Sequence, residues 1–190
     1  MFGACKVAPH LLEATPELKD RTLIVNGVSK SYAMTGWRIG WALGPSALIK
    51  AIADYQSQAT SSASSISQKA ALVAIQKCDS DMVKSNLLLK ERLDTCLKSV
   101  NSIPLIKAAR PDGAFYVWID ISQTLGKKYD THTISSSRDF ASILLEKYYV
   151  AAVPGIEFGF EGFLRISFAI ESERMIEALK RMNEFISKLH

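Results

Sequence analysis

The chain has 190 residues, of which 48% are hydrophobic and 22% charged, so it can build a packed core and general intrinsic disorder is excluded. This length suits one domain, or one domain and part of another. The formal net charge of +4 is spread along the sequence without a basic tract, so we expect neither a nucleic-acid partner nor a membrane partner.

The cysteines and histidines are scattered along the chain: Cys5, Cys78 and Cys96, and His10, His132 and His190. Their spacing matches no metal-ligand pattern, so we expect no metal site and reduced thiols. Reduced thiols indicate a reducing compartment. No apolar run is long enough to cross a bilayer, and the first residues lack the apolar stretch of a signal peptide. We therefore expect a cytoplasmic protein.

The first twenty or so residues are expected to be loop-like. Thr22–Val25 is apolar and rich in β-branched residues, which predicts a buried strand, and Asn26-Gly27 predicts a turn that ends it. Ile39–Leu43 predicts a second strand. Ser46 is expected to cap a helix that follows Pro45. This order of strand, loop, strand and helix is typical of an α/β domain.

A serine- and threonine-rich stretch, Thr60–Ser67, separates that region from the helical pattern of Ala70–Ile75. Asp79-Ser80-Asp81 then predicts the start of a long helix. We place a domain boundary at this helix. The expected domains are residues 1–78, the C-terminal part of a larger α/β domain, and residues 79–190, a small domain.

The small domain is expected to mix strands and helices. Its expected elements are a strand beginning at Leu105-Ile106, a strand at Ala114–Ile119, a helix after Ser135–Ser137, strands at Val150–Val153 and Phe163–Ala169, and a helix at Glu171–Leu189. Apolar residues of the last segment recur at helical spacing, which indicates an amphipathic helix that covers a core. The pattern predicts a small α+β domain.

The most informative segment is Ser29-Lys30-Ser31-Tyr32-Ala33-Met34-Thr35-Gly36-Trp37-Arg38-Ile39-Gly40. It places a lysine in a small-residue loop after a strand, with an arginine shortly after it, which suits a reactive amine beside an anion clamp. The segment resembles the cofactor-lysine motif of class I pyridoxal-phosphate-dependent aminotransferases, especially the bacterial aspartate aminotransferase branch. The resemblance implies an α/β protein of fold type I, with a remnant of the large αβα domain followed by the small C-terminal α+β domain.

The resemblance also implies pyridoxal 5'-phosphate as cofactor and gives roles to two residues. Lys30 would hold the cofactor aldehyde covalently, and its amine, once displaced by substrate, would act as the catalytic proton carrier. Arg38 would bind the cofactor phosphate, because a guanidinium forks onto phosphate oxygens. The alternatives are a solvated surface lysine and an arginine in a surface salt bridge.

Arg165 is the candidate substrate-binding residue. Alternation along its strand places Leu164 and Ile166 on one face and Arg165 on the other. An arginine within an apolar strand is costly unless it meets an anion. The run resembles the family strand whose arginine binds the substrate α-carboxylate, which would orient the Cα–H bond. The alternative is an arginine that pairs with a structural glutamate.

Other aromatic residues carry weaker expectations. Trp37, Trp41 and Trp118 are expected mainly in the core, since aromatic side chains bury large areas. The segment from Pro154 to Phe160 resembles a loop that borders the substrate in the family, although ordinary turn chemistry accounts for it nearly as well.

The resemblance covers the whole chain but only the C-terminal half of the family's sequence. The family's upstream elements include a glycine-containing phosphate loop, an aromatic that stacks on the cofactor ring, and an Asp-Glu-Ile-Tyr run whose aspartate contacts the ring nitrogen. No acidic residue of this chain replaces that aspartate convincingly. We therefore expect this stretch alone to be a poor catalyst or inactive. The resemblance also implies a homodimer for the full-length protein.

The leading hypothesis is an aminotransferase that moves an amino group between an amino acid and a 2-oxo acid, with aspartate and 2-oxoglutarate as the expected pair. A second hypothesis keeps the fold and cofactor but changes the reaction, to a β-lyase or an aminocyclopropanecarboxylate-type synthase. A third is a truncated remnant without catalytic activity.

Overall fold

The structure, a computed structural model, describes residues 8–190. The chain forms two compact units, which we call the N-terminal unit (described for residues 8–86) and the C-terminal unit (Leu87–His190). The division falls inside helix α5 (Asp79–Val100), whereas the sequence analysis placed the domain boundary at the start of this helix. Among the described residues, no helix has the length and apolar character that a bilayer-crossing segment needs.

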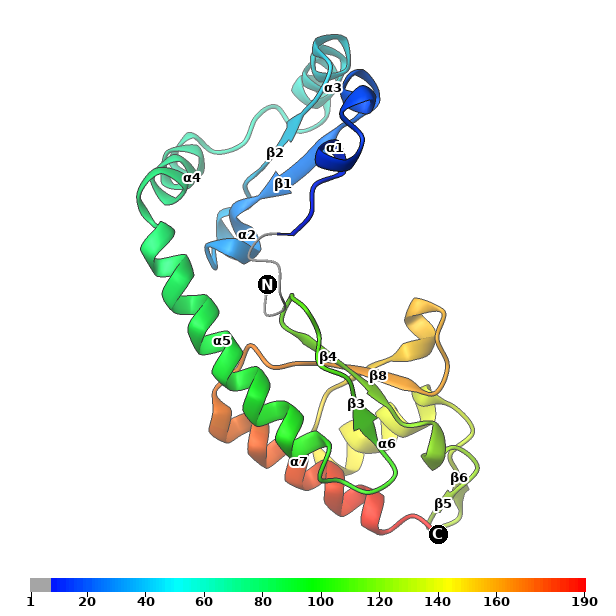
Figure 1. Cartoon of the computed structure of the whole chain (residues 1–190). Helices are drawn as coiled ribbons and strands as arrows, with labels where there is room; N and C mark the ends of the chain where they lie inside the picture. The colour runs from blue at the N-terminus through cyan, green and yellow to red at the C-terminus, as the bar shows by residue number, and fades with distance from the viewer. Residues whose placement is uncertain (1–7) are drawn as a thin grey trace. The chain divides into compact units, whose positions relative to one another are not determined.

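The N-terminal unit contains one antiparallel pair of strands and several helices (Figure 1). Its elements, with short 3-10 helices labelled η, are α1 (Leu11–Ala14), η1 (Pro16–Arg21), β1 (Ile24–Gly27), α2 (Val28–Ser31), η2 (Thr35–Trp37), β2 (Gly40–Leu43), α3 (Ser46–Ala59), α4 (Ser65–Lys77) and the start of α5. Val28, Ile39 and Ala71 form its buried core, so α4 packs on the connection between the two strands.

Strand β1 lies two residues later than the sequence predicted. Thr22 is the C-cap residue of η1. Its backbone is already extended, with φ −110° and ψ 130°, but its amide donates to the Lys19 carbonyl and its hydroxyl donates to the Leu18 carbonyl at 2.8 Å, so these groups bond to the helix rather than to a partner strand. Asn26-Gly27, predicted as a turn, forms the last pairs of the strand, with Gly27 opposite Gly40. A Cβ at Gly27 would lie 2.9 Å from the Ile39 carbonyl oxygen, so the glycine serves a close approach of the strands rather than a turn.

Helix α3 begins at Ser46, so the prediction that Ser46 caps this helix was wrong. Pro45 is the N-cap residue, in an extended conformation with φ −56° and ψ 135°, and no side chain caps the helix. Helix α5 does begin at Asp79, with Asp79 and Asp81 in its first turn, where carboxylates offset the helix dipole.

The C-terminal unit is built on a four-stranded antiparallel sheet in the order β3-β4-β8-β7 (Figure 1). Its elements after α5 are β3 (Lys107–Ala108), β4 (Tyr116–Asp120), η3 (Ser122–Thr124), β5 (Lys128–Tyr129), β6 (His132–Thr133), α6 (Ser137–Tyr148), β7 (Val153–Pro154), η4 (Gly155–Phe158), β8 (Phe163–Ser167) and α7 (Ser172–Ser187).

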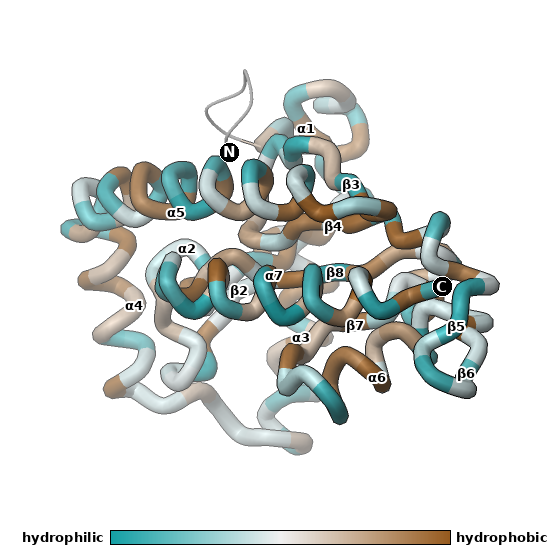
Figure 2. The backbone as a smooth tube through the Cα atoms, turned by 90° about the horizontal axis from the view of Figure 1, so that it is seen from below, coloured by the Kyte–Doolittle hydropathy of each residue, from teal (hydrophilic) through white to brown (hydrophobic). Residues whose placement is uncertain are grey.

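One face of this sheet packs against helices and forms the main core. Val117, Ile119 and Leu164 are fully buried on that face, together with residues of α5, α6 and α7. Hydrophilic and hydrophobic positions alternate along α5 and α7, as Figure 2 shows, because each helix buries one side only. The opposite face of the sheet carries the side chains that alternate with these.

Each predicted element of the C-terminal unit has a counterpart, but several bounds were wrong. β3 begins at Lys107, two residues after the predicted Leu105, and β7 shares only Val153 with the predicted strand. β4 and β8 are shorter than predicted. Ser136 caps α6 by accepting a hydrogen bond from the Asp139 amide at 3.2 Å. The small β5–β6 hairpin was not predicted. It consists of two residue pairs only, Lys128 with Thr133 and Tyr129 with His132, and so has no run long enough to show alternation.

The two cysteines within the described residues, Cys78 and Cys96, are free thiols, as expected. Burial raises the pKa of Cys96 to about 11, which keeps this thiol protonated and poorly reactive. Cys5 lies outside the described residues.

We expect Gly40→Ala to weaken the β1–β2 pair, because its Cβ would lie 2.9 Å from the Asn26 carbonyl oxygen. The strain corresponds to about 1–3 kcal/mol, so amide hydrogen exchange across both strands should quicken by about 10- to 100-fold. Gly36→Ala is the matched control, since its Cβ would have no heavy atom within 4 Å. Equal exchange rates in the two variants would contradict the close approach.

Candidate functional site

Lys30 lies on the connection between β1 and β2, in the single turn of α2. The neighbouring Val28 is fully buried and fixes the turn to the small core, while Lys30 is exposed. The lysine therefore sits on an anchored turn with its side chain on the outer side of the N-terminal unit.

Arg38 lies at the other end of the same connection, between η2 and β2. It adopts the left-handed conformation, with φ 53° and ψ 48°, which a non-glycine residue seldom takes. One guanidinium nitrogen, Nη1, donates to the Thr35 carbonyl at 3.0 Å, and the next residue, Ile39, is buried in the small core. The arginine is exposed, so most of its donors remain directed outward.

Arg165 lies on β8, in the C-terminal unit, with Trp118 on β4 and Val153 on β7 as its cross-strand neighbours. Leu164 is fully buried in the core on the helix-covered face of the sheet. The alternation predicted from the sequence therefore holds, and Arg165 lies on the face opposite the helices. It is only partly buried there.

Aromatic rings surround the Arg165 guanidinium. Its central carbon lies 4.2 Å from the Tyr116 ring centroid and 4.5 Å from that of Phe158. Trp118 contacts Phe158 edge-on at 5.5 Å and stacks on Phe163 at 5.7 Å. Trp118 and Trp37 thus depart from the expectation of core residues: Trp118 lines the open face, and Trp37 is 44% exposed.

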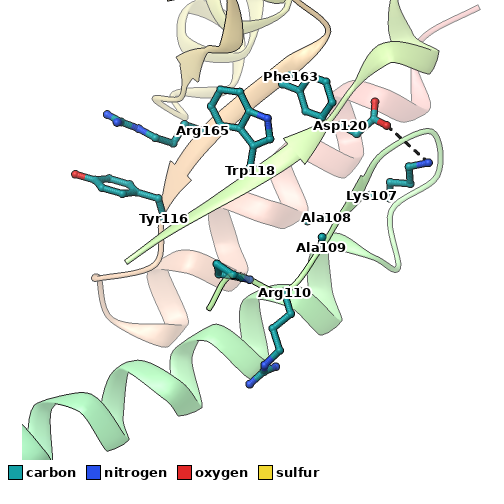
Figure 3. A pocket seen from close by; sticks show the side chains of 10 residues that line it. Lys107, Ala108, Ala109, Arg110, Tyr116, Trp118, Asp120, Phe163 and Arg165 are labelled. Atoms are coloured by element: carbon teal, nitrogen blue, oxygen red, sulfur yellow. Dashed lines mark ion pairs between the residues drawn. The ribbon is translucent and has the colours of Figure 1, made fainter. Parts of the chain in front are cut away.

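A pocket of about 540 Å³ opens on this face (Figure 3). It is lined by Lys107, Ala108, Ala109, Arg110, Pro111, Tyr116, Trp118, Asp120, Phe163 and Arg165. Its walls are mainly apolar and aromatic, and its three cations come from different strands and loops. A largely apolar hollow with a few charged groups is typical of small-molecule sites.

The pocket cations differ in their partners. Lys107 lies 3.7 Å from the Asp120 carboxylate, and Arg110 pairs with Asp94 at 2.6 Å. Within residues 8–190, no carboxylate lies at ion-pair distance from Arg165. The alternative of a structural glutamate partner is therefore not seen in the described part of the chain.

The structure brings Lys30 and Arg38 together on one connection of the N-terminal unit, and it places Arg165 in the C-terminal unit. Tyr116 was not predicted as a neighbour of Arg165. Alternation along β4 puts Tyr116, Trp118 and Asp120 on one face. The same alternation that located Arg165 could therefore have predicted the face that carries Tyr116. Among the described residues, no group of three or more His, Cys, Asp or Glu side chains forms a possible metal site.

Comparison with known proteins gives the family of the chain. The sequence model of aminotransferase class I and II matches residues 1–182. The chain belongs to this family. It is 43% identical over 180 residues to the aspartate/prephenate aminotransferase of Nitrosomonas europaea, an alignment that covers 94% of this chain and 45% of that protein. It is 45% identical over 177 residues to the aspartate aminotransferase of Rhizobium meliloti, covering 93% of this chain and 43% of that one.

The fold agrees with this assignment. The crystal structure of the Rhizobium meliloti aspartate aminotransferase matches with a TM-score of 0.94 at 41% identity, over 100% of this chain and 47% of that one. The fold is therefore that of the fold-type I aminotransferases, as the resemblance implied. Class I and II aminotransferases depend on pyridoxal 5'-phosphate. The chain spans about half the length of the curated relatives it matches.

Asp120 gives a testable feature of the pocket. Its carboxylate accepts hydrogen bonds from the Ser122 hydroxyl at 2.6 Å and the Ser122 amide at 2.9 Å, and these bonds, with Lys107, lower the pKa of Asp120. Because the folded pKa lies below the unfolded one, the ion stabilises the fold above the unfolded pKa. That contribution is lost as the pH falls through the folded pKa, below about pH 4.

We expect Ser122→Ala to raise the pKa of Asp120, as measured by NMR titration of its carboxyl carbon. The variant should also show a smaller difference in the free energy of unfolding between neutral and acid pH. Ser142→Ala, at an exposed position of α6, is the control. An unchanged Asp120 titration in Ser122→Ala would show that the hydroxyl does not stabilise the carboxylate.

Proposed function

We propose that this chain carries the cofactor lysine, the phosphate-binding arginine and the substrate-carboxylate arginine of a pyridoxal-phosphate-dependent aminotransferase. The observation that supports it most is the placement of Lys30 and Arg38 on one short connection, closed by Gly27 and Gly40, in a chain of this family. The connection provides an amine, which can bind an aldehyde, and a guanidinium, which can bind a phosphate. Pyridoxal 5'-phosphate carries both of these groups.

The residues of this connection fit the cofactor. The amine and the guanidinium are both exposed, and both ends of the connection are held by the buried Val28 and Ile39. When bound, pyridoxal 5'-phosphate supplies the electron sink for amino-acid chemistry. In this proposal Lys30 Nζ holds the aldehyde carbon, and Arg38 holds the phosphate by charge-assisted hydrogen bonds.

Lys30 then has a second role, as a base and an acid. With pyridoxal 5'-phosphate and substrate bound, the Nζ nitrogen would take the proton from the substrate α-carbon and deliver it to the carbon of the former aldehyde, so that the proton moves from one carbon to the other. The backbone of Lys30 is anchored in the turn of α2, which limits the region that its Nζ can reach. The amine therefore stays close to the bound substrate during the proton transfer.

Arg165 orients the substrate in this proposal. A bidentate pair between its guanidinium and the α-carboxylate fixes the rotation of the substrate about its Cα. The support is the position of Arg165 on the open face of the sheet, with no carboxylate partner among residues 8–190.

The proposed substrates are aspartate as amino donor and 2-oxoglutarate as acceptor. The support is that the relatives from Nitrosomonas europaea and Rhizobium meliloti are an aspartate/prephenate aminotransferase and an aspartate aminotransferase. We further propose a homodimer in the cytoplasm for the whole protein, as aminotransferases of this family generally form dimers.

The test is absorbance of the purified protein with added pyridoxal 5'-phosphate. We expect a band in the visible that is abolished in Lys30→Ala, because the conjugated adduct needs the Nζ amine. Lys50→Ala, which removes an exposed lysine paired with Asp54 in the same unit, should keep the band. The proteins that show the band should also form glutamate from aspartate and 2-oxoglutarate at a low rate, and Lys30→Ala should form none.

A band that survives in Lys30→Ala would contradict the assignment of the cofactor lysine. Absence of glutamate from aspartate, together with release of a thiol, pyruvate and ammonia from an added amino acid that carries a sulfur leaving group on its β-carbon, would instead support the β-lyase chemistry of the same fold.

A further inference from the structure

The Arg165 guanidinium is held between rings from two elements. Tyr116 belongs to β4, and Phe158 to η4, which begins directly after β7. Strands β4 and β7 pair with opposite edges of β8. The two rings therefore approach Arg165 from opposite sides of its strand, and both lie within 4.5 Å of its central carbon.

This contact leaves the donors of the guanidinium available. Aromatic rings attract a guanidinium over their faces, whereas carboxylates bind its N–H groups in the guanidinium plane. Tyr116 and Phe158 restrict the rotation of the side chain without using its N–H groups. A protein carboxylate in the same place would restrict it equally but would also neutralise the charge.

The position of Phe158 is itself fixed by several contacts. Gly155, at the start of η4, is buried, and a Cβ there would lie 2.7 Å from the Phe163 carbonyl oxygen. Arg138 of α6 donates to Glu157 at 2.8 Å, and Trp118 meets the Phe158 ring edge-on. Although Phe158 is 44% exposed, it lies on a segment that is tied to both the helix and the sheet.

We propose that Tyr116 and Phe158 form an aromatic clamp, two positioning residues that hold the Arg165 guanidinium so that its N–H edge meets a planar carboxylate. The clamp rests on the proposed function in that it takes Arg165 as the carboxylate-binding residue. It adds a specificity: a planar carboxylate fits the guanidinium plane with two parallel hydrogen bonds, whereas a tetrahedral sulfonate places its third oxygen against a ring.

The test compares Phe158→Leu, which removes the ring, with Phe158→Tyr, which keeps it. The first readout is nitrogen-15 relaxation and hydrogen exchange of the Arg165 Nε–H group, assigned by its absence in Arg165→Lys. The second is NMR titration with succinate and with ethane-1,2-disulfonate, two dianions whose acid groups are joined by the same –CH2–CH2– linker.

We expect faster Nε–H motion in Phe158→Leu, succinate binding weakened by about 3- to 10-fold, and a smaller preference for succinate over the disulfonate. Phe158→Tyr should stay within about twofold of the parent chain. A purely structural role of Phe158 would not change the ratio between the two ligands.

Unchanged Nε–H motion in Phe158→Leu would overturn the clamp, whichever ligands bind. An equal loss of both ligands would overturn the specificity. If the parent chain binds no succinate while the leucine variant still loosens Arg165, then the proposed function of Arg165 fails and the clamp stands as a positioning device. If the NMR spectrum of Phe158→Leu loses its chemical-shift dispersion, that variant is unfolded. Tyr116→Leu then takes its place, and the same outcomes apply to it.

Discussion

The proposed cofactor site depends on the close approach of two backbone segments at Gly27 and Gly40. These residues face each other at the last pair of the β1–β2 hairpin, where a side chain on either would meet a carbonyl oxygen at 2.9 Å. Their contact closes a short connection, and the buried Val28 and Ile39 hold its two ends. Lys30 and Arg38 both lie on this connection, so the backbone positions of both depend on the same local anchors. A reactive amine and an anion clamp need this mutual placement more than they need burial.

The C-terminal unit also anchors the backbone of a charged residue, but it does so through a sheet. Here the buried face of β8 fixes the strand, and Arg165 projects from the other face because side chains alternate. Rings from neighbouring elements, rather than a protein carboxylate, then restrict the guanidinium. In both units the charged group is exposed or half-buried while its backbone is anchored in a core. Exposure keeps the group accessible to a ligand, and anchoring lowers the entropy that binding costs.

Much of this could be predicted from the sequence, because the signals are local. Alternation located β8 and the face that carries Arg165, and helical spacing located α5, α6 and α7. The motif around Lys30 identified the family, which the comparisons show. Local signals failed where long-range contacts decide. Asn26-Gly27 has the composition of a turn, and only its pairing with β2 extends the strand through it. Likewise, Phe158 meets Arg165 because β7 pairs with β8, an order that periodicity does not contain.

The central claim is that the Nζ of Lys30 joins the cofactor. The most direct measurement treats the purified chain with pyridoxal 5'-phosphate, reduces the adduct with borohydride, and locates the modified lysine by mass spectrometry of its peptides. The account predicts that the phosphopyridoxyl group is found on the peptide that contains Lys30, at a stoichiometry well above that of any other lysine. Labelling spread evenly over surface lysines such as Lys50, or absent from Lys30, would contradict it.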